Sequence, residues 1–152
     1  MEKNYFEDYT MGERLTTPAR TLTESDIVNF AGLTGDWHPL HTDREYAAKS
    51  EFGERIAHGM LTLSIGTALL YRLGPHVSLP KSFIAFYGMD QVRFIHPCRI
   101  GDTLHCVWEV LDLIEKDDER GILVAKNRIV NQKGEDLVVY ITRALVGRNP
   151  DA

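Results

Sequence analysis

The stretch that decides the fold is HGMLTLSIGTALLYRL, from His58 to Leu73, in which apolar residues leave almost no polar face on a helix. A helix that is apolar nearly all round is buried and does not lie at the surface. Gly74 and Pro75 follow directly and supply a helix stop signal. We therefore expect one long helix in the core of the molecule, covered by other elements.

Downstream of this helix the hydrophobic period changes to two, which is typical of strands. The expected strands are Phe83 to Tyr87, Gln91 to Phe94, Thr103 to Val110, Ile122 to Val130 and Leu137 to Val146. Residues 131–134, ending in Gly134, give a hairpin signal between the last two. A buried helix followed by antiparallel strands predicts an α+β fold with the sheet curled around the helix.

Upstream of the long helix, two short helices are expected on either side of a loop. A capping box at residues 23–26 opens the first, which Gly32 stops. A second T-x-x-E pattern at residues 42–45 opens the other, which runs to about Ser50. Between them, Gly35 and Pro39 disfavour regular helix, so this segment is predicted to be a shaped loop.

Length and composition limit the possible functions. We interpret the 152 residues as one domain, residues 1–152. The net charge is −5 with no basic block, which argues against a nucleic-acid partner. The N-terminus is polar and acidic, and the most apolar stretch is too short to span a bilayer, so no membrane association is expected. Cys98 and Cys106 have no metal or redox spacing, and the sequence predicts a cytoplasmic protein.

Asp36, His38 and His41 form the first cluster of residues that could carry chemistry. An imidazole titrates near neutrality, and a neighbouring carboxylate can share proton transfer with it. The structural alternative is that Asp36 satisfies backbone groups of the turn and that His41 is a packed core histidine. Spacing alone leaves both interpretations open.

His58 and Gly59 form the second cluster, at the entrance of the long helix. The first N–H groups of a helix have no internal partner, and together with the helix dipole they attract negative charge. Gly59 has no side chain, so a carbonyl oxygen could approach its N–H and find an oxyanion hole there. A glycine selected only for tight packing explains the same pattern.

A zinc site built from Asp36, His38, His41 and His58 is the competing interpretation of these clusters. Pro39 works against the helical i, i+4 spacing that many histidine pairs use, and no downstream residue completes a ligand set. We therefore expect neither a metal nor a cofactor. No nucleophile elbow or phosphate-binding loop is present in the sequence either.

These motifs together resemble a known family. Residues 35–43 (GDWHPLHTD) and 56–61 (IAHGML) look like the signature of MaoC-like dehydratases and R-specific enoyl-CoA hydratases. Residues 92–97 (VRFIHP) and 101–104 (GDTL) look like a later stretch of the same family. The resemblance covers nearly the whole chain. One departure is His38, which stands where the family usually has asparagine.

The resemblance implies a hotdog fold, in which an antiparallel sheet wraps a long helix, and usually a homodimer or higher homo-oligomer. It maps the catalytic pair onto Asp36 and His41 and the carbonyl-binding glycine onto Gly59. It places supporting side chains at Thr67, Ser64 and His38. The substrate-binding side chains expected beside them are His58, Met60, Leu63 and Phe86.

The activity implied is hydration of a trans-2-enoyl-CoA to an R-3-hydroxyacyl-CoA, or the reverse dehydration, by a hydro-lyase that needs no cofactor. Asp36 and His41 would hold a water over C3, and the thioester carbonyl would meet the Gly59 N–H. Alternatives with the same fold are an acyl-CoA thioesterase and a non-catalytic acyl-CoA binding protein. A subunit of a heteromeric dehydratase, acting on carrier-protein thioesters or branched dicarboxyl-CoA compounds, is a further alternative.

Overall fold

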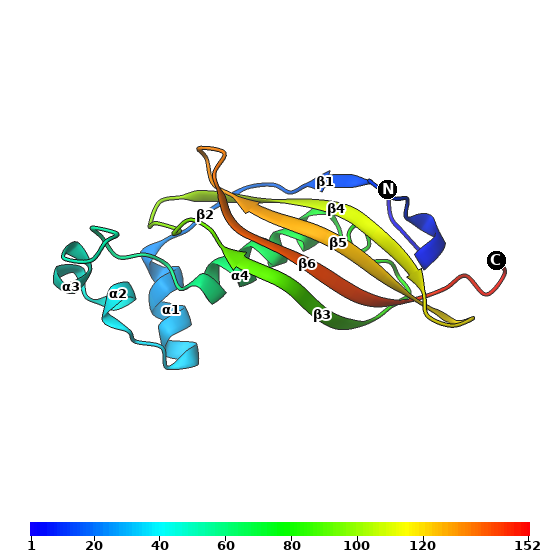
Figure 1. Ribbon diagram of the computed structural model, residues 1–152, viewed down its shortest axis with the longest axis horizontal. Coiled ribbons are helices and arrows are strands. Elements are labelled where there is room, and N and C mark those ends of the chain that lie inside the picture. The colour runs from blue at the N-terminus through cyan, green and yellow to red at the C-terminus, as the bar shows by residue number, and fades with distance from the viewer.

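A computed structural model describes residues 1–152 and confirms the α+β class. A six-stranded antiparallel sheet curves around helix α4, and three further helices lie together beyond one end of the sheet (Figure 1). The elements in chain order are the 3₁₀ turn η1 (Phe6–Asp8), β1 (Arg14–Thr16), β2 (Arg20–Thr21), α1 (Glu24–Thr34), α2 (Pro39–Thr42), α3 (Arg44–Ala48), α4 (Gly59–Ala68), the 3₁₀ helix η2 (Leu69–Leu73), β3 (Phe83–Phe94), β4 (Thr103–Glu115), β5 (Arg120–Val130) and β6 (Asp136–Gly147).

The sheet has the strand order β1-β4-β5-β6-β3, with β2 also paired to β4. The expected hairpin between β5 and β6 is confirmed, and Gly134 adopts a positive φ of 79° in its turn. Strand β3 stands at the edge of the sheet and pairs only with β6. One side of β3 therefore carries backbone groups without a strand partner.

Helix α4 packs closely onto the sheet because Gly66 faces Ile129 of β5. A Cβ atom on Gly66 would lie 2.2 Å from Cδ1 of Ile129, whose side chain is fully buried. Apolar side chains from α4 and the sheet pack around this contact, among them Leu61, Leu63 and Leu137. The helix is buried as expected on this side, although Met60 on its other side is exposed.

The structure corrects several predicted boundaries. The long helix is α-helical only to Ala68 and continues to Leu73 as the tighter η2. The two short strands predicted between Phe83 and Phe94 are one strand with register shifts, because pairing with β6 continues through the middle. The segment predicted to be a loop contains α2, whose first residue is Pro39. Proline is tolerated there because the first N–H of a helix has no partner to lose.

The N-cap of the second short helix lies one residue later than predicted. Asp43 is the N-cap of α3 and accepts a hydrogen bond from the Tyr46 N–H, whereas Thr42 belongs to the end of α2. The capping box of α1 is confirmed, with Thr23 and Asp26 bonded reciprocally, but the helix continues through Gly32 and ends at Thr34, with Gly35 as its C-cap. None of the helices combines the length and the apolar character that crossing a membrane requires.

Candidate active site

Asp36 lies in the short connection between α1 and α2. Helix α1 ends at Gly35, which adopts the left-handed conformation with φ of 79°. That conformation turns the chain and directs it toward α4. The Asp36 carboxylate accepts a hydrogen bond from the His38 N–H at 3.2 Å, and the side chain remains exposed. The loop thus presents a carboxylate that solvent or a ligand can reach.

His38 supports this loop through two hydrogen bonds. Its backbone N–H donates to the Asp36 carboxylate. Its Nδ1 accepts a hydrogen bond from the Leu40 N–H at 3.1 Å, and this bond caps α2. Its ring stands 6.1 Å from that of His41 in an edge-on arrangement. The residue that departs from the family pattern therefore has a structural role at this point.

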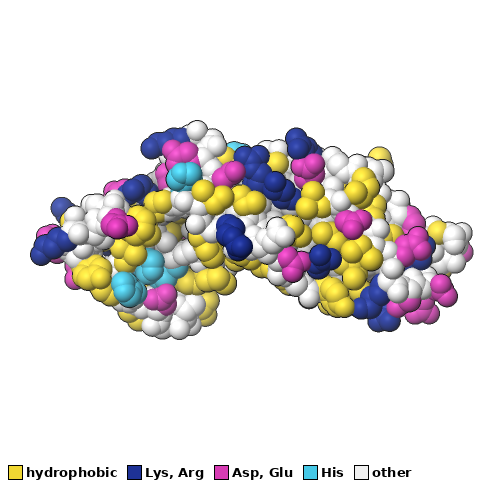
Figure 2. All heavy atoms as spheres, in the orientation of Figure 1, with side chains coloured by type: hydrophobic (Ala, Val, Ile, Leu, Met, Phe, Trp, Pro, Cys, Tyr) yellow, Lys and Arg dark blue, Asp and Glu magenta, His cyan; other side chains and the backbone are white.

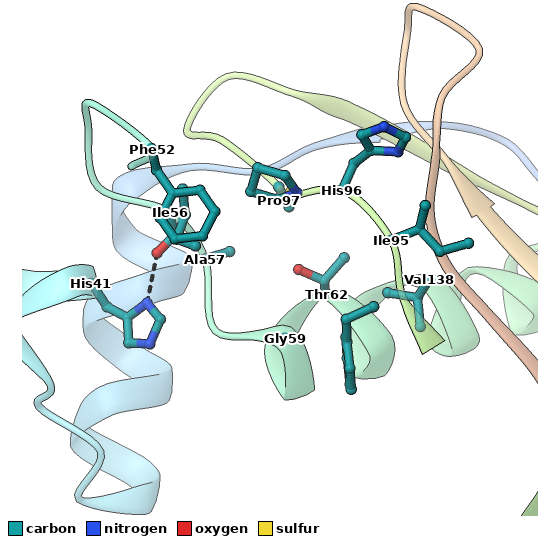
Figure 3. A pocket seen from close by; sticks show the side chains of 12 residues that line it. His41, Phe52, Ile56, Ala57, Gly59, Thr62, Ile95, His96, Pro97 and Val138 are labelled. Carbon is teal, nitrogen blue, oxygen red and sulfur yellow. Dashed lines mark hydrogen bonds between the residues drawn. The ribbon is translucent and has the colours of Figure 1, made fainter. Parts of the chain in front are cut away.

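His41 lies in the last turn of α2, and its hydrogen bond fixes which nitrogen is basic. The Nδ1–H donates to the carbonyl oxygen of Ile56 at 2.8 Å (Figure 3). A carbonyl oxygen can only accept, so the free lone pair of neutral His41 is on Nε2. Burial lowers the pKa of His41 below its ordinary value of 6.5, although the Ile56 hydrogen bond works in the opposite direction. At neutral pH the ring is a neutral base.

Gly59 begins α4 and faces the same space as His41 (Figure 3). The Phe94 ring lies over it, and a Cβ on Gly59 would be only 2.9 Å from that ring. Its N–H belongs to the first turn, where helix N–H groups have no partner within the helix. The close approach of the Phe94 ring favours glycine here, and without a side chain the Gly59 N–H is open to a ligand.

A pocket of about 500 Å³ joins His41 to Gly59, whereas Asp36 and His38 do not line it. It opens between the helical end of the molecule and the end of β3, and Figure 2 shows histidine, acidic and hydrophobic side chains gathered on this part of the surface. Its lining consists of His41, Phe52, Ile56, Ala57, Gly59, Thr62, Phe94, Ile95, His96, Pro97, Cys98 and Val138. The lining is mostly apolar with few polar groups, as in sites that bind organic ligands.

Sequence reasoning missed several of these lining residues. Phe52, Phe94 and His96 come from two segments that meet only in the folded chain. Cys98 also lines the pocket, but burial raises the pKa of its thiol to about 12. The thiol therefore stays protonated at neutral pH and is unsuited to act as a nucleophile.

The side chains of Asp36, His41 and His58 could in principle bind a metal, since one ligand atom of each lies within 4.8 Å of the others. However, Nε2 of His58 donates to the main-chain carbonyl of Asp36 at 2.9 Å, and Nδ1 of His41 is bound to Ile56. Zinc held through Nε2 of His58 would break the first of these bonds. The Nδ1 bond of His41 leaves its Nε2 free for either a metal or a proton, so only the His58 bond counts against zinc.

The other predicted site residues lie elsewhere along α4 and β3. Thr67 bonds to the Tyr140 hydroxyl at 2.5 Å and, with Phe86, lines a separate small cavity. The Ser64 hydroxyl donates a hydrogen bond to the Met60 carbonyl oxygen on the exposed side of the helix. Leu63 is a core residue. Within a single chain these residues do not lie at the site formed by Asp36, His41 and Gly59, and their roles remain predictions.

Comparisons with known proteins show which family the chain resembles. The family model described as MaoC like domain matches residues 7–132. An (R)-specific enoyl-CoA hydratase of Rhodospirillum rubrum is 39% identical over 111 residues, which are 73% of this chain and 72% of that protein. Protein MaoC of Klebsiella aerogenes is 46% identical over 102 residues, which are 67% of this chain but only 29% of that longer protein.

Solved structures extend the likeness over almost the whole chain. A protein described as a monoamine oxidase regulatory protein from Archaeoglobus has a TM-score of 0.91 and 40% identity, and the match covers 97% of each chain. A MaoC-like dehydratase from Rhodospirillum rubrum aligns with a TM-score of 0.83, and a Mycobacterium tuberculosis protein described as having a double hotdog fold aligns with a TM-score of 0.80. The hotdog fold expected from the sequence is therefore confirmed, and the chain belongs to the MaoC-like domain family.

Proposed function

We propose that this protein is a hydro-lyase that adds water to a trans-2-enoyl-CoA, giving an R-3-hydroxyacyl-CoA, and that it also catalyses the reverse dehydration. The observation that carries the proposal is the arrangement of His41. The Ile56 hydrogen bond to Nδ1 leaves the lone pair on Nε2, and the ring is neutral. His41 lines the same apolar pocket as Gly59. Named relatives with hydratase or dehydratase activity support the same reaction class.

In this mechanism the thioester carbonyl accepts the Gly59 N–H at the start of α4. Negative charge develops on that oxygen as water adds to C3, and a helix N-terminus stabilises it. His41 Nε2 takes one proton from the water while its oxygen forms the bond to C3. The Asp36 carboxylate orients the water and offsets the positive charge that forms on the imidazole.

The same nitrogen then returns its proton to C2. His41 Nδ1 already donates to Ile56, so Nε2 is the only nitrogen that can exchange protons with the substrate. The elements of water are thereby added across the double bond without a cofactor. Because one group handles the proton, both hydrogen and hydroxyl should arrive on the same face of the substrate. Hydration in D₂O should give the product of syn addition.

The first test is the absorbance of the enoyl-thioester band when the protein is mixed with crotonyl-CoA. Loss of absorbance without free thiol is expected for a hydratase, whereas release of free thiol would identify a thioesterase. His41→Ala should lower kcat/KM about 10²–10⁴-fold, as loss of a general acid or base does. Asp36→Asn should also lower kcat/KM, because the water loses its orienting carboxylate and the imidazolium loses its counter-charge. Asp118→Asn, in an exposed turn, is the matched control.

We further propose that the protein acts as a homodimer joined along β3. This edge strand exposes a row of large hydrophobic side chains, and Figure 2 shows hydrophobic atoms over the part of the surface where β3 runs in Figure 1. The residues are Phe83, Ile84, Phe86 and Tyr87, with exposed fractions of 39%, 51%, 54% and 49%. Light scattering should give twice the 17.3 kDa chain mass. A monomer at micromolar concentration would contradict this assembly.

A further inference from the structure

We propose that His58 is a positioning residue that fixes the positions of Asp36 and His41 relative to each other. This inference rests on the proposed hydration reaction. His58 is the N-cap of α4 and is only 3% exposed. A side chain this buried has no surface to offer an acyl-CoA. Its burial therefore favours a supporting role over the substrate contact expected from the sequence.

The first restraint that His58 provides acts on Asp36. Its Nε2–H donates to the main-chain carbonyl of Asp36 at 2.9 Å, across 22 positions of sequence. This bond ties the α1–α2 loop to the entrance of α4, where Gly59 begins the helix. The carboxylate and the Gly59 N–H are thus positioned by one shared side chain. Loss of the bond would also leave a carbonyl without its partner and release the loop.

The second restraint acts on His41. The two imidazole rings stack with their centres 3.9 Å apart and their planes 29° from parallel, and the Phe30 ring of α1 lies 4.8 Å from His58. The Ile56 hydrogen bond fixes one edge of His41, and the His58 ring limits rotation of its plane. Together these contacts direct Nε2 of His41 to one point in the pocket.

His58 also influences the charge of His41. Burial lowers the pKa of His41 most, and the His58 ring adds to this lowering. Of the other titratable groups facing His41, Asp36 raises its pKa and His38 lowers it. Replacing His58 by a residue that cannot be protonated should therefore raise the pKa of His41.

Two substitutions separate the restraints. His58→Gln retains an N–H near the Nε2 position and loses the ring, whereas His58→Phe retains a flat ring and loses the donor. We expect His58→Phe to lower kcat for crotonyl-CoA about 10–100-fold with little change in KM, since a misplacement near 1 Å costs about that much. His58→Gln should lose less kcat than His58→Phe, because its donor still holds the loop and only the stacking on His41 is lost. His105→Gln on β4 is the histidine control.

Nitrogen NMR of the histidine rings tests the proposal without any substrate. Wild type should show His58 protonated on Nε2 and His41 on Nδ1, and the His41 pKa should rise in both His58 variants. This readout still decides the matter if His58→Phe does not fold, or if wild type turns over no enoyl-CoA and the hydratase proposal fails. Wild-type kcat in His58→Phe, a loss in His58→Gln as large as in His58→Phe, or a wild-type His58 whose ring proton lies on Nδ1 and not on Nε2 would overturn the positioning role.

Discussion

Replacing Gly66 by alanine should destabilise the protein, although the same change stabilises most helices. An alanine in a helix interior is favoured over glycine by about 1 kcal/mol. At position 66, however, the new Cβ would lie 2.2 Å from Cδ1, 2.4 Å from Cγ1 and 3.0 Å from Cγ2 of Ile129. Ile129 has no exposed surface, so its side chain cannot swing into solvent.

The magnitude follows from setting these two effects against each other. Overpacking a core typically costs about 1–3 kcal/mol, and contacts this short belong at the upper end. After subtracting the propensity gain, the net loss in the free energy of unfolding should be about 2 kcal/mol. For a chain of this size that corresponds to a fall of roughly 4–8 °C in the melting temperature.

Gly32→Ala is the matched control, because Gly32 also lies inside a helix and its nearest neighbour, Trp37, is 4.0 Å away. This variant should gain about 1 kcal/mol. Urea unfolding followed by circular dichroism measures both changes. In the double variant Gly66→Ala with Ile129→Ala, the new methyl group should occupy part of the cavity, so the combined loss should be smaller than the sum of the single losses. Additive losses, or a stabilised Gly66→Ala, would refute the proposed clash.

Three further outcomes are expected. Gln91 has a φ of 51°, which costs a side-chain residue about 1–2 kcal/mol, so Gln91→Gly should raise the melting temperature whereas Gln91→Ala should not. Because the pKa of His41 is lowered, kcat/KM should decline on acidification with a midpoint below the ordinary value of 6.5; a decline centred above 6.5 would contradict the assignment. Thr23→Ala removes the cap of α1 and should cost about 1 kcal/mol in chemical denaturation.

Local sequence patterns predicted the elements whose signals are local. The cap at Thr23 and the hairpin ending in Gly134 depend on neighbouring residues, and both are confirmed. Strand β3 was divided incorrectly because its continuity depends on β6, about fifty residues away, and not on its own alternation. Pro39 was interpreted as a helix breaker, although at the first position of a helix proline breaks nothing.

The candidate site shows the same limit. Asp36, His41 and Gly59 could be selected because two short motifs carry them, and the folded chain brings these motifs to the same end of the molecule. The bond from His58 to the Asp36 carbonyl and the ring of Phe94 over Gly59 join distant segments. No spacing rule reveals such contacts, since they depend on how the helical end docks onto the sheet.

The position of α1, α2 and α3 beyond the end of the sheet has a consequence for how the protein loses activity (Figure 1). Asp36 and His41 lie on this helical extension, whereas most of the buried core lies between α4 and the sheet. Segments with little buried surface open at lower free energy than the core to which they are attached. Amide hydrogens of α2 and α3 should therefore exchange with solvent well before those of β5 and β6. On warming, turnover should disappear while the sheet is still intact, so inactivation and global unfolding become two separate events.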